Sequence, residues 1–129
     1  MRIDHIAVWT EDLDRLAHFY ATYFSAVIGP AYSNASKGFE SRFLSFADGA
    51  RLEIMRTRSL TLLPRAPGVE SAGLTHLAVS VGSERGVEEL TARLRQDGHT
   101  VLLGPRRTGD GYYESVILDP DGNRIEITA

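Results

Sequence analysis

The sequence contains no cysteine, which excludes two kinds of structure at once. Neither disulfide bonds nor thiolate metal ligands are available, so a bound metal would need nitrogen and oxygen ligands. No stretch reaches the roughly 18 apolar residues that a membrane-spanning helix requires. The N-terminal residues also lack the basic start and apolar stretch of a secretory signal. We therefore expect a cytoplasmic protein with no membrane partner.

An excess of positive charge is also missing. The chain has 14 basic and 17 acidic residues, for a formal net charge of −3. Because nucleic-acid binding usually depends on a basic surface, we expect no nucleic-acid partner. The length of 129 residues and the apolar content of 43% are those of one ordinary globular domain.

Two segments of the chain occur twice. Residues 48–54 (Asp-Gly-Ala-Arg-Leu-Glu-Ile) match residues 121–127 (Asp-Gly-Asn-Arg-Ile-Glu-Ile), with the glutamates 73 positions apart at 53 and 126. Upstream, residues 3–8 match residues 74–79, with the histidines 71 positions apart at 5 and 76. We infer a single domain, 1–129, made of two repeats at about 1–56 and 73–129. The repeats are joined by a connection at 57–72 that contains Pro64, Pro67 and Gly68.

The two repeats have the same expected order of elements, β-α-β-β-β. Alternating apolar and polar residues indicate strands, and apolar residues three and four apart indicate one helix in each repeat. The first repeat is expected to contain strand 2–9, a helix from about 13 to 24, and strands 39–46 and 51–55. The second is expected to contain strand 74–81, helix 83–96, and strands 99–103, 112–118 and 123–128. This order favours an α+β fold with mixed, largely antiparallel sheets.

The alternation also separates the two faces of the strands. In the strands that carry His5, Glu53, His76 and Glu126, the continuous branched-aliphatic face is the one opposite the His or Glu. We expect the helices to cover the aliphatic face, which leaves the His and Glu face to line a cavity. His18 and His99 do not share this pattern and are expected to be structural or solvated.

Two histidines and two glutamates at matching positions are suited to one divalent metal ion. A glutamate on a partly dry strand is costly unless it is paired or ligated, and imidazole with carboxylate would offset that cost. The ligand set suits Zn, Ni, Co, Mn or Fe without choosing among them. The alternative is structural: each His could be an ordinary polar residue, and each Asp-Gly-x-Arg-x-Glu segment a surface hairpin with a paired Arg and Glu.

The paired β-α-β-β-β modules, the His-(Ile/Leu)-Ala-Val strands and the terminal Asp-Pro-Asp-Gly-Asn-Arg-Ile-Glu-Ile segment resemble the vicinal oxygen chelate superfamily. This superfamily includes glyoxalase I, fosfomycin- and bleomycin-resistance proteins and extradiol dioxygenases, and the resemblance covers essentially the whole chain. It implies sheets that curl into a cup around one metal, with His5, Glu53, His76 and Glu126 as ligands. It also implies a homodimer.

Among these branches, a glutamate in both modules favours the glyoxalase-I-like one. The resemblance then implies a lyase or isomerase acting on a small molecule, whose metal chelates substrate oxygens while a glutamate moves a proton α to a carbonyl. Glu126 is the expected base and Glu53 the alternative. Two other functions stay open: an extradiol-type dioxygenase using Fe, and a non-catalytic antibiotic-binding protein.

The residues that would bind the substrate are less well marked. Bacterial glyoxalase I has an arginine four residues after its first His, where this chain has Trp9, so glutathione recognition is not expected from this position. Trp9 could provide a flat apolar wall, with simple packing as the alternative. Further candidates for binding an oxygenated or anionic substrate, for which an ordinary polar surface is the favoured alternative, are Arg42, Arg106, Arg107, Tyr112, Tyr113 and Glu114.

Overall fold

The computed structural model describes residues 1–61, 70 and 72–129, and the chain divides into two compact units. Unit 1 spans Met1–Pro64 and unit 2 spans Arg65–Ala129. The boundary between them falls inside the predicted connection at 57–72, of which residues 62–69 and 71 lie outside the described residues. Within the described part of the chain, no helix is both long and apolar enough to cross a membrane.

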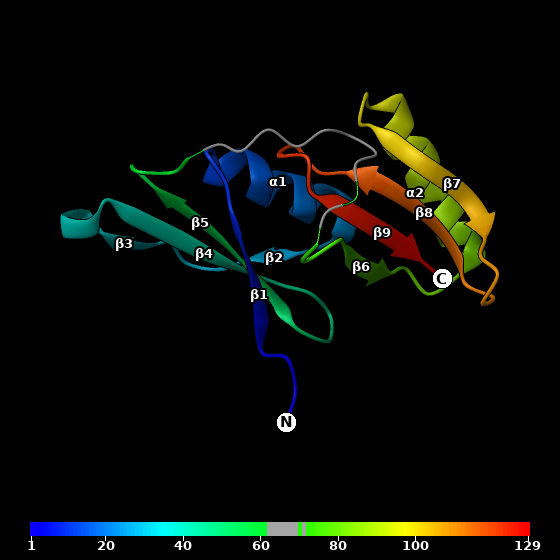
Figure 1. Cartoon of the computed structure of the whole chain (residues 1–129), viewed down its shortest axis with the longest axis horizontal. Coiled ribbons are helices and arrows are strands. Elements are labelled where there is room, and N and C mark those ends of the chain that lie inside the picture. The colour runs from blue at the N-terminus through cyan, green and yellow to red at the C-terminus, as the bar shows by residue number, and fades with distance from the viewer. Residues whose placement is uncertain (62–69, 71) are drawn as a thin grey trace. The chain divides into compact units, whose positions relative to one another are not determined.

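Unit 1 is built on a five-stranded mixed sheet (Figure 1). Its main path runs β1-β5-β4-β2, and β3 pairs with β4. The β1–β5 pair is parallel and the remaining pairs are antiparallel. In chain order the elements are β1 (His5–Trp9), α1 (Leu13–Phe24), β2 (Val27–Ile28), β3 (Tyr32–Asn34), the 3-10 helix η1 (Ala35–Lys37), β4 (Phe39–Ser45) and β5 (Arg51–Thr57).

Unit 2 repeats this plan with four strands in the order β6-β9-β8-β7. The β6–β9 pair is parallel, as β1–β5 is in unit 1, and the other two pairs are antiparallel. The elements are β6 (Leu77–Ser80), α2 (Glu84–Gln96), β7 (Val101–Arg107), β8 (Tyr113–Leu118) and β9 (Arg124–Thr128). The predicted α+β class with mixed sheets is confirmed.

Each helix starts at a side chain that satisfies a free backbone amide. Asp12 accepts a hydrogen bond from the amide of Arg15 at the start of α1, and Ser83 accepts one from Gly86 at the start of α2. After α2, Gly98 adopts a φ of 86°, the left-handed conformation in which many helices end. Both helices therefore run close to the predicted ranges.

The helices cover one face of each sheet, as the alternation predicted. α1 packs on β4 and β5, and α2 packs on β7, β8 and β9. The interface is aliphatic and aromatic in unit 1 and aliphatic in unit 2, with side chains that are fully or almost fully buried. The cores are Leu16, Phe19, Tyr20, Leu44, Leu52 and Ile54 in unit 1, and Val87, Leu94, Ile117, Ile125 and Ile127 in unit 2.

The structure differs from the predicted strands in several places. β2, β3 and η1 lie between α1 and β4, where the repeated order predicted one further strand without assigning it to residues. β6 begins at Leu77 instead of residue 74, because its partner β9 begins only at Arg124. β7 ends at Arg107 instead of residue 103, because it continues past two register shifts that interrupt the alternation of its side chains.

Candidate metal centre

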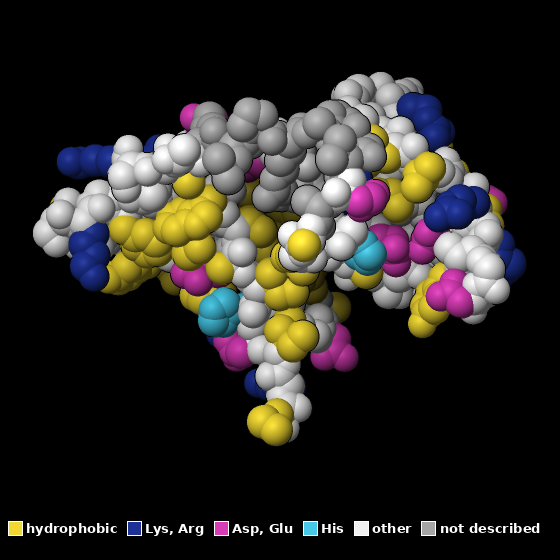
Figure 2. All heavy atoms as spheres, in the orientation of Figure 1, with side chains coloured by type: hydrophobic (Ala, Val, Ile, Leu, Met, Phe, Trp, Pro, Cys, Tyr) yellow, Lys and Arg dark blue, Asp and Glu magenta, His cyan; other side chains and the backbone are white. Residues whose placement is uncertain are grey.

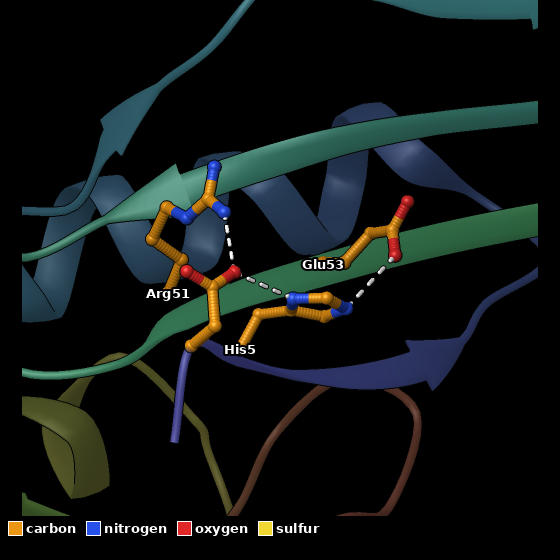
Figure 3. Close-up of polar contacts among 4 residues, drawn as sticks. His5, Arg51 and Glu53 are labelled. Atoms are coloured by element: carbon orange, nitrogen blue, oxygen red, sulfur yellow. Dashed lines mark hydrogen bonds and ion pairs between the residues drawn. The ribbon is translucent and has the colours of Figure 1, made fainter. Parts of the chain in front are cut away.

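The first His–Glu pair is formed by two adjacent parallel strands of unit 1. In the β1–β5 register His5 lies opposite Arg51 and Ala7 opposite Glu53, which places His5 and Glu53 on the same face. His5 Nε2 lies 3.8 Å from Glu53 Oε2 (Figure 3). The His5 side chain is 41% exposed and the Glu53 side chain 17%, so both side chains are partly accessible to solvent.

Asp4 contacts the other ring nitrogen of His5, Nδ1. Its Oδ2 lies 2.9 Å from His5 Nδ1 and also accepts a hydrogen bond from Arg51 at 2.6 Å. The hydrogen bonds from His5 and Arg51 lower the pKa of Asp4 below its ordinary value. Because an ionised carboxylate can only accept, a neutral His5 would carry its proton on Nδ1. Nε2 would then be free to bind a metal, with Asp4 orienting the ring.

Unit 2 contains the same pair in the same register. Ala78 lies opposite Glu126 as Ala7 lies opposite Glu53, and His76 comes two residues before Ala78. His76 Nε2 is 3.5 Å from Glu126 Oε2, with side-chain exposures of 42% and 18%. The two units thus present nearly identical His–Glu pairs, each on the sheet face opposite its helix.

The surroundings of the second pair differ from those of the first. Thr75 occupies the position of Asp4, so the residue before His76 carries no carboxylate. Arg124, the counterpart of Arg51, instead donates to both carboxylate oxygens of Glu70 at 2.9 Å. Ligand orientation by an acidic neighbour is therefore a feature of unit 1.

A buried carboxyl group, Glu114, lies beside Glu126. Glu114 is opposite Thr128 in the β8–β9 register, which puts it on the face of Glu126, and it is only 7% exposed. Burial, followed by the charge of Glu126 and a hydrogen bond with it, raises the pKa of Glu114. Arg106, whose Nη2 is 3.2 Å from Glu114 Oε1, acts in the opposite direction. Glu114 therefore lies on the same face as His76 and Glu126, and it forms a hydrogen bond with Glu126.

Three other predicted substrate residues lie on the faces covered by the helices. Each contacts its helix. Arg42 forms an ion pair with Asp14 of α1 at 3.1 Å, while Tyr113 donates a hydrogen bond to Glu88 of α2 at 2.9 Å and Arg107 pairs with Glu84 of α2. The structure therefore does not bring Arg42, Tyr113 or Arg107 to the His–Glu faces.

The remaining candidates have more exposed positions. Trp9 lies on the His5–Glu53 face at the end of β1, and Tyr112 is exposed just before β8. His18 is exposed on α1 and His99 is half-buried after α2.

The donor chemistry of the two pairs fits a divalent metal ion. Imidazole nitrogen and carboxylate oxygen are common ligands of Zn and related ions, and in both pairs they face each other on an exposed side of the sheet. Among the described residues, no group of three or more His, Cys, Asp or Glu side chains is arranged to hold a metal. Each pair by itself therefore supplies two ligands, fewer than protein metal sites generally use.

A separate cavity of about 350 Å³ lies in unit 1, away from the His–Glu pair. Phe39 and Thr57 contribute to it from the sheet face that also carries Glu53. Its other walls are largely polar and include Ser33, Asn34, Glu40, Arg56 and Arg58. Arg56 forms an ion pair with Glu40, so its charge is already balanced within the cavity wall.

The sequence model of the Glyoxalase/Bleomycin resistance protein/Dioxygenase superfamily matches residues 2–127. No curated protein matches the chain. Solved structures show the same fold. The trypanothione-dependent glyoxalase I of Leishmania major is similar over 99% of this chain and 86% of its own length, at 21% identity and a TM-score of 0.76.

Two further structures have the same fold. A glyoxalase family protein from Enterococcus faecalis covers 99% of this chain and 97% of its own, at 24% identity and a TM-score of 0.78. Glyoxalase I from Zea mays covers 98% of this chain, at 20% identity and a TM-score of 0.77, and this chain spans 44% of the maize protein. These likenesses confirm the predicted fold.

Proposed function

Because the chain belongs to the Glyoxalase/Bleomycin resistance protein/Dioxygenase superfamily, we propose that it is a divalent-metal-dependent lyase or isomerase of the glyoxalase-I-like type. The observation that carries this proposal is the His–Glu pair that occurs once in each unit, with Nε2 to Oε2 distances of 3.8 and 3.5 Å. A pair that recurs in both register and geometry is more readily explained by a shared ligand role than by two unrelated surface contacts.

In this proposal His5, Glu53, His76 and Glu126 are the ligands of one divalent ion, which could be Zn, Ni, Co, Mn or Fe. When bound, such an ion polarises the substrate oxygens and stabilises the negative charge that develops on them. The chain itself supplies two imidazoles and two half-buried carboxylates, and the two carboxylates match the charge of a divalent ion. Asp4 would keep the ring of His5 oriented.

The proposed chemical step is a proton transfer carried out by a glutamate. The carbon α to a substrate carbonyl gives its proton to the carboxylate of Glu126, which returns it to the neighbouring carbon, so the substrate isomerises without an external oxidant. Glu53 has the equivalent position in unit 1 and is the alternative base. Glu126 is favoured because the carboxyl group of Glu114 lies beside it and provides a second proton-carrying group.

The proposal includes a small-molecule substrate and a cytoplasmic homodimer. Light scattering on the untagged protein would then report twice the chain mass of 14.2 kDa.

The reaction class can be tested by solvent isotope exchange. Protein loaded separately with Zn²⁺, Ni²⁺, Co²⁺, Mn²⁺ or Fe²⁺ is incubated in deuterium oxide with hemithioacetals of methylglyoxal or phenylglyoxal, and the carbon α to the carbonyl is followed by NMR. We expect metal-dependent deuterium incorporation or isomerisation, reduced at least about 100-fold in Glu126→Gln. Oxygen uptake with catechols in the Fe²⁺ form, without exchange, would instead support the dioxygenase alternative.

A further inference from the structure

Three aromatic side chains form a continuous ridge on the metal-facing side of unit 1. This aromatic ridge consists of Trp9, Phe39 and Tyr32. The rings of Trp9 and Phe39 meet edge to face with centroids 6.2 Å apart, and Tyr32 follows at 6.1 Å from Phe39. Trp9 is 48% exposed and Tyr32 is also exposed, while Figure 2 shows hydrophobic side chains gathered on unit 1 beside a histidine. An exposed cluster of this kind is typical of a binding surface.

The strand register places the ridge on the same face as the ligand pair. Trp9 lies opposite Met55. This pair is two residues further along the strands than the pair formed by Ala7 and Glu53. At a rise of about 3.3 Å per residue, the Trp9 backbone is about 7 Å further along the strand than that pair. This is the length of a benzoyl group, so a molecule whose oxygens lie at Glu53 could place a ring against Trp9.

The second repeat serves as an internal control for this feature. At the positions equivalent to Trp9 and Met55, 71 and 73 residues later, it has Ser80 and Thr128. Next to Met55, Ser41 of β4 is paired with Tyr32 of β3. At the equivalent place in unit 2, next to Thr128, Glu114 of β8 is paired with Arg106 of β7. The same fold therefore forms with polar residues at the positions of Trp9 and Tyr32, so the architecture does not require these two aromatic residues.

We propose that the aromatic ridge selects substrates in which a flat apolar group, such as a phenyl ring, is attached next to the metal-chelating oxygens, and that Trp9 is the main contact. This inference rests on the proposed function, because it assumes that the substrate oxygens bind at the His–Glu ligands. Stacking and edge contacts with Trp9 and Phe39 supply the selectivity. Small aliphatic analogues would bind through their oxygens alone.

Two hydroxamates provide a matched pair of probes. Benzohydroxamate and acetohydroxamate present the same two chelating oxygens and differ by a phenyl group in place of a methyl group. Affinities are measured by calorimetry on metal-loaded protein, and Trp9, the only tryptophan of the chain, reports contact directly through its fluorescence. We expect benzohydroxamate to bind about tenfold more tightly and to change the fluorescence.

The decisive variant is Trp9→Ser, which introduces the residue found at the equivalent position of unit 2. It should remove the tenfold preference while leaving metal content unchanged and acetohydroxamate affinity within about twofold. Trp9→Phe should keep part of the preference, and His18→Ala, which removes an exposed ring from α1 on the opposite face of the sheet, should keep all of it.

The possible outcomes separate this inference from the function on which it rests. Equal affinities for the two probes, or a phenyl preference that survives in Trp9→Ser, would overturn the role of the ridge and leave the metal site standing. Failure of both probes to bind metal-loaded protein would overturn the proposed function. Phenyl-selective binding that depends on Trp9 but needs no metal would support the ridge and point to a sequestering protein.

Discussion

At the scale of single residues, the histidine of unit 1 is held more firmly than that of unit 2. His5 has a carboxylate at each ring nitrogen, Asp4 at 2.9 Å and Glu53 at 3.8 Å. His76 is preceded by Thr75, which cannot provide the same contact. Fixing the ring before a metal arrives lowers the entropic cost of binding, so the two histidines should contribute unequally to metal affinity.

Replacing Asp4 by Asn tests this orienting contact. We expect Asp4→Asn to weaken Zn²⁺ binding about tenfold in calorimetric titrations, because the ring would lose its charged hydrogen-bond partner. Asp14→Asn is the matched control: it removes one carboxylate of unit 1 from α1, which covers the opposite face of the sheet. Equal affinities for the two variants would show that Asp4 contributes only charge.

Glu114 should make stability depend on pH in metal-free protein. Its pKa is raised in the folded state, mainly by burial and then by Glu126, so the native state holds this proton at pH values where the unfolded chain has released it. The free energy of unfolding therefore falls as pH rises above the unfolded value of about 4.5.

We expect Glu114→Gln to unfold at higher denaturant concentration than wild type at pH 8, with the difference shrinking towards pH 4.5. Glu11→Gln, which changes an exposed glutamate of unit 1, is the control. The difference between its unfolding midpoint and that of wild type should not change with pH. If Glu114→Gln also runs parallel to wild type in urea unfolding across this range, its carboxyl group is not destabilised by its surroundings.

At the scale of elements, the strand that carries Glu114 is closely packed against its neighbour. Gly104 of β7 has a φ of 83°, and a Cβ atom there would lie 2.6 Å from the carbonyl oxygen of Glu114. Only glycine fits this approach, because a side chain would be strained by its backbone conformation and would also push against β8.

Gly104→Ala should therefore destabilise the protein by about 2 kcal/mol or more in guanidinium unfolding. Gly109→Ala is the matched control, since a Cβ atom at Gly109 meets nothing within 4 Å. A loss of less than about 0.5 kcal/mol in Gly104→Ala would mean that β7 can move away from β8 without cost.

The elements differ in how far the sequence could predict them. The two helices were predictable because their apolar spacing and their caps at Asp12 and Ser83 agree. The face of Arg42 was not predictable, because Phe43 and Leu44 put large apolar side chains on both faces of β4 and leave no clear alternation. Asp4 was missed because it lies just before β1 begins, where the alternation of a strand does not fix the direction of a side chain.

At the scale of the whole molecule, the repeat was the most informative signal. It predicted two similar mixed sheets with one His and one Glu on the same face of each, because equivalent sequences fold to equivalent registers. The parallel pairing of β1 with β5 and of β6 with β9 was not predicted. The contact of Glu114 with Glu126 was not predictable from the repeat. It depends on the register of β8 against β9 and on the burial of the Glu114 side chain.

We propose that His5, Glu53, His76 and Glu126 bind one ion together, and metal stoichiometry distinguishes this arrangement from two separate pairs. Elemental analysis of untagged, metal-reconstituted protein would be run beside Glu53→Gln, Glu126→Gln and the control Glu11→Gln. We expect one divalent ion per chain, retained by the control and sharply reduced by either ligand variant. Folded wild type without bound metal, or two ions per chain of which each ligand variant loses one, would contradict it.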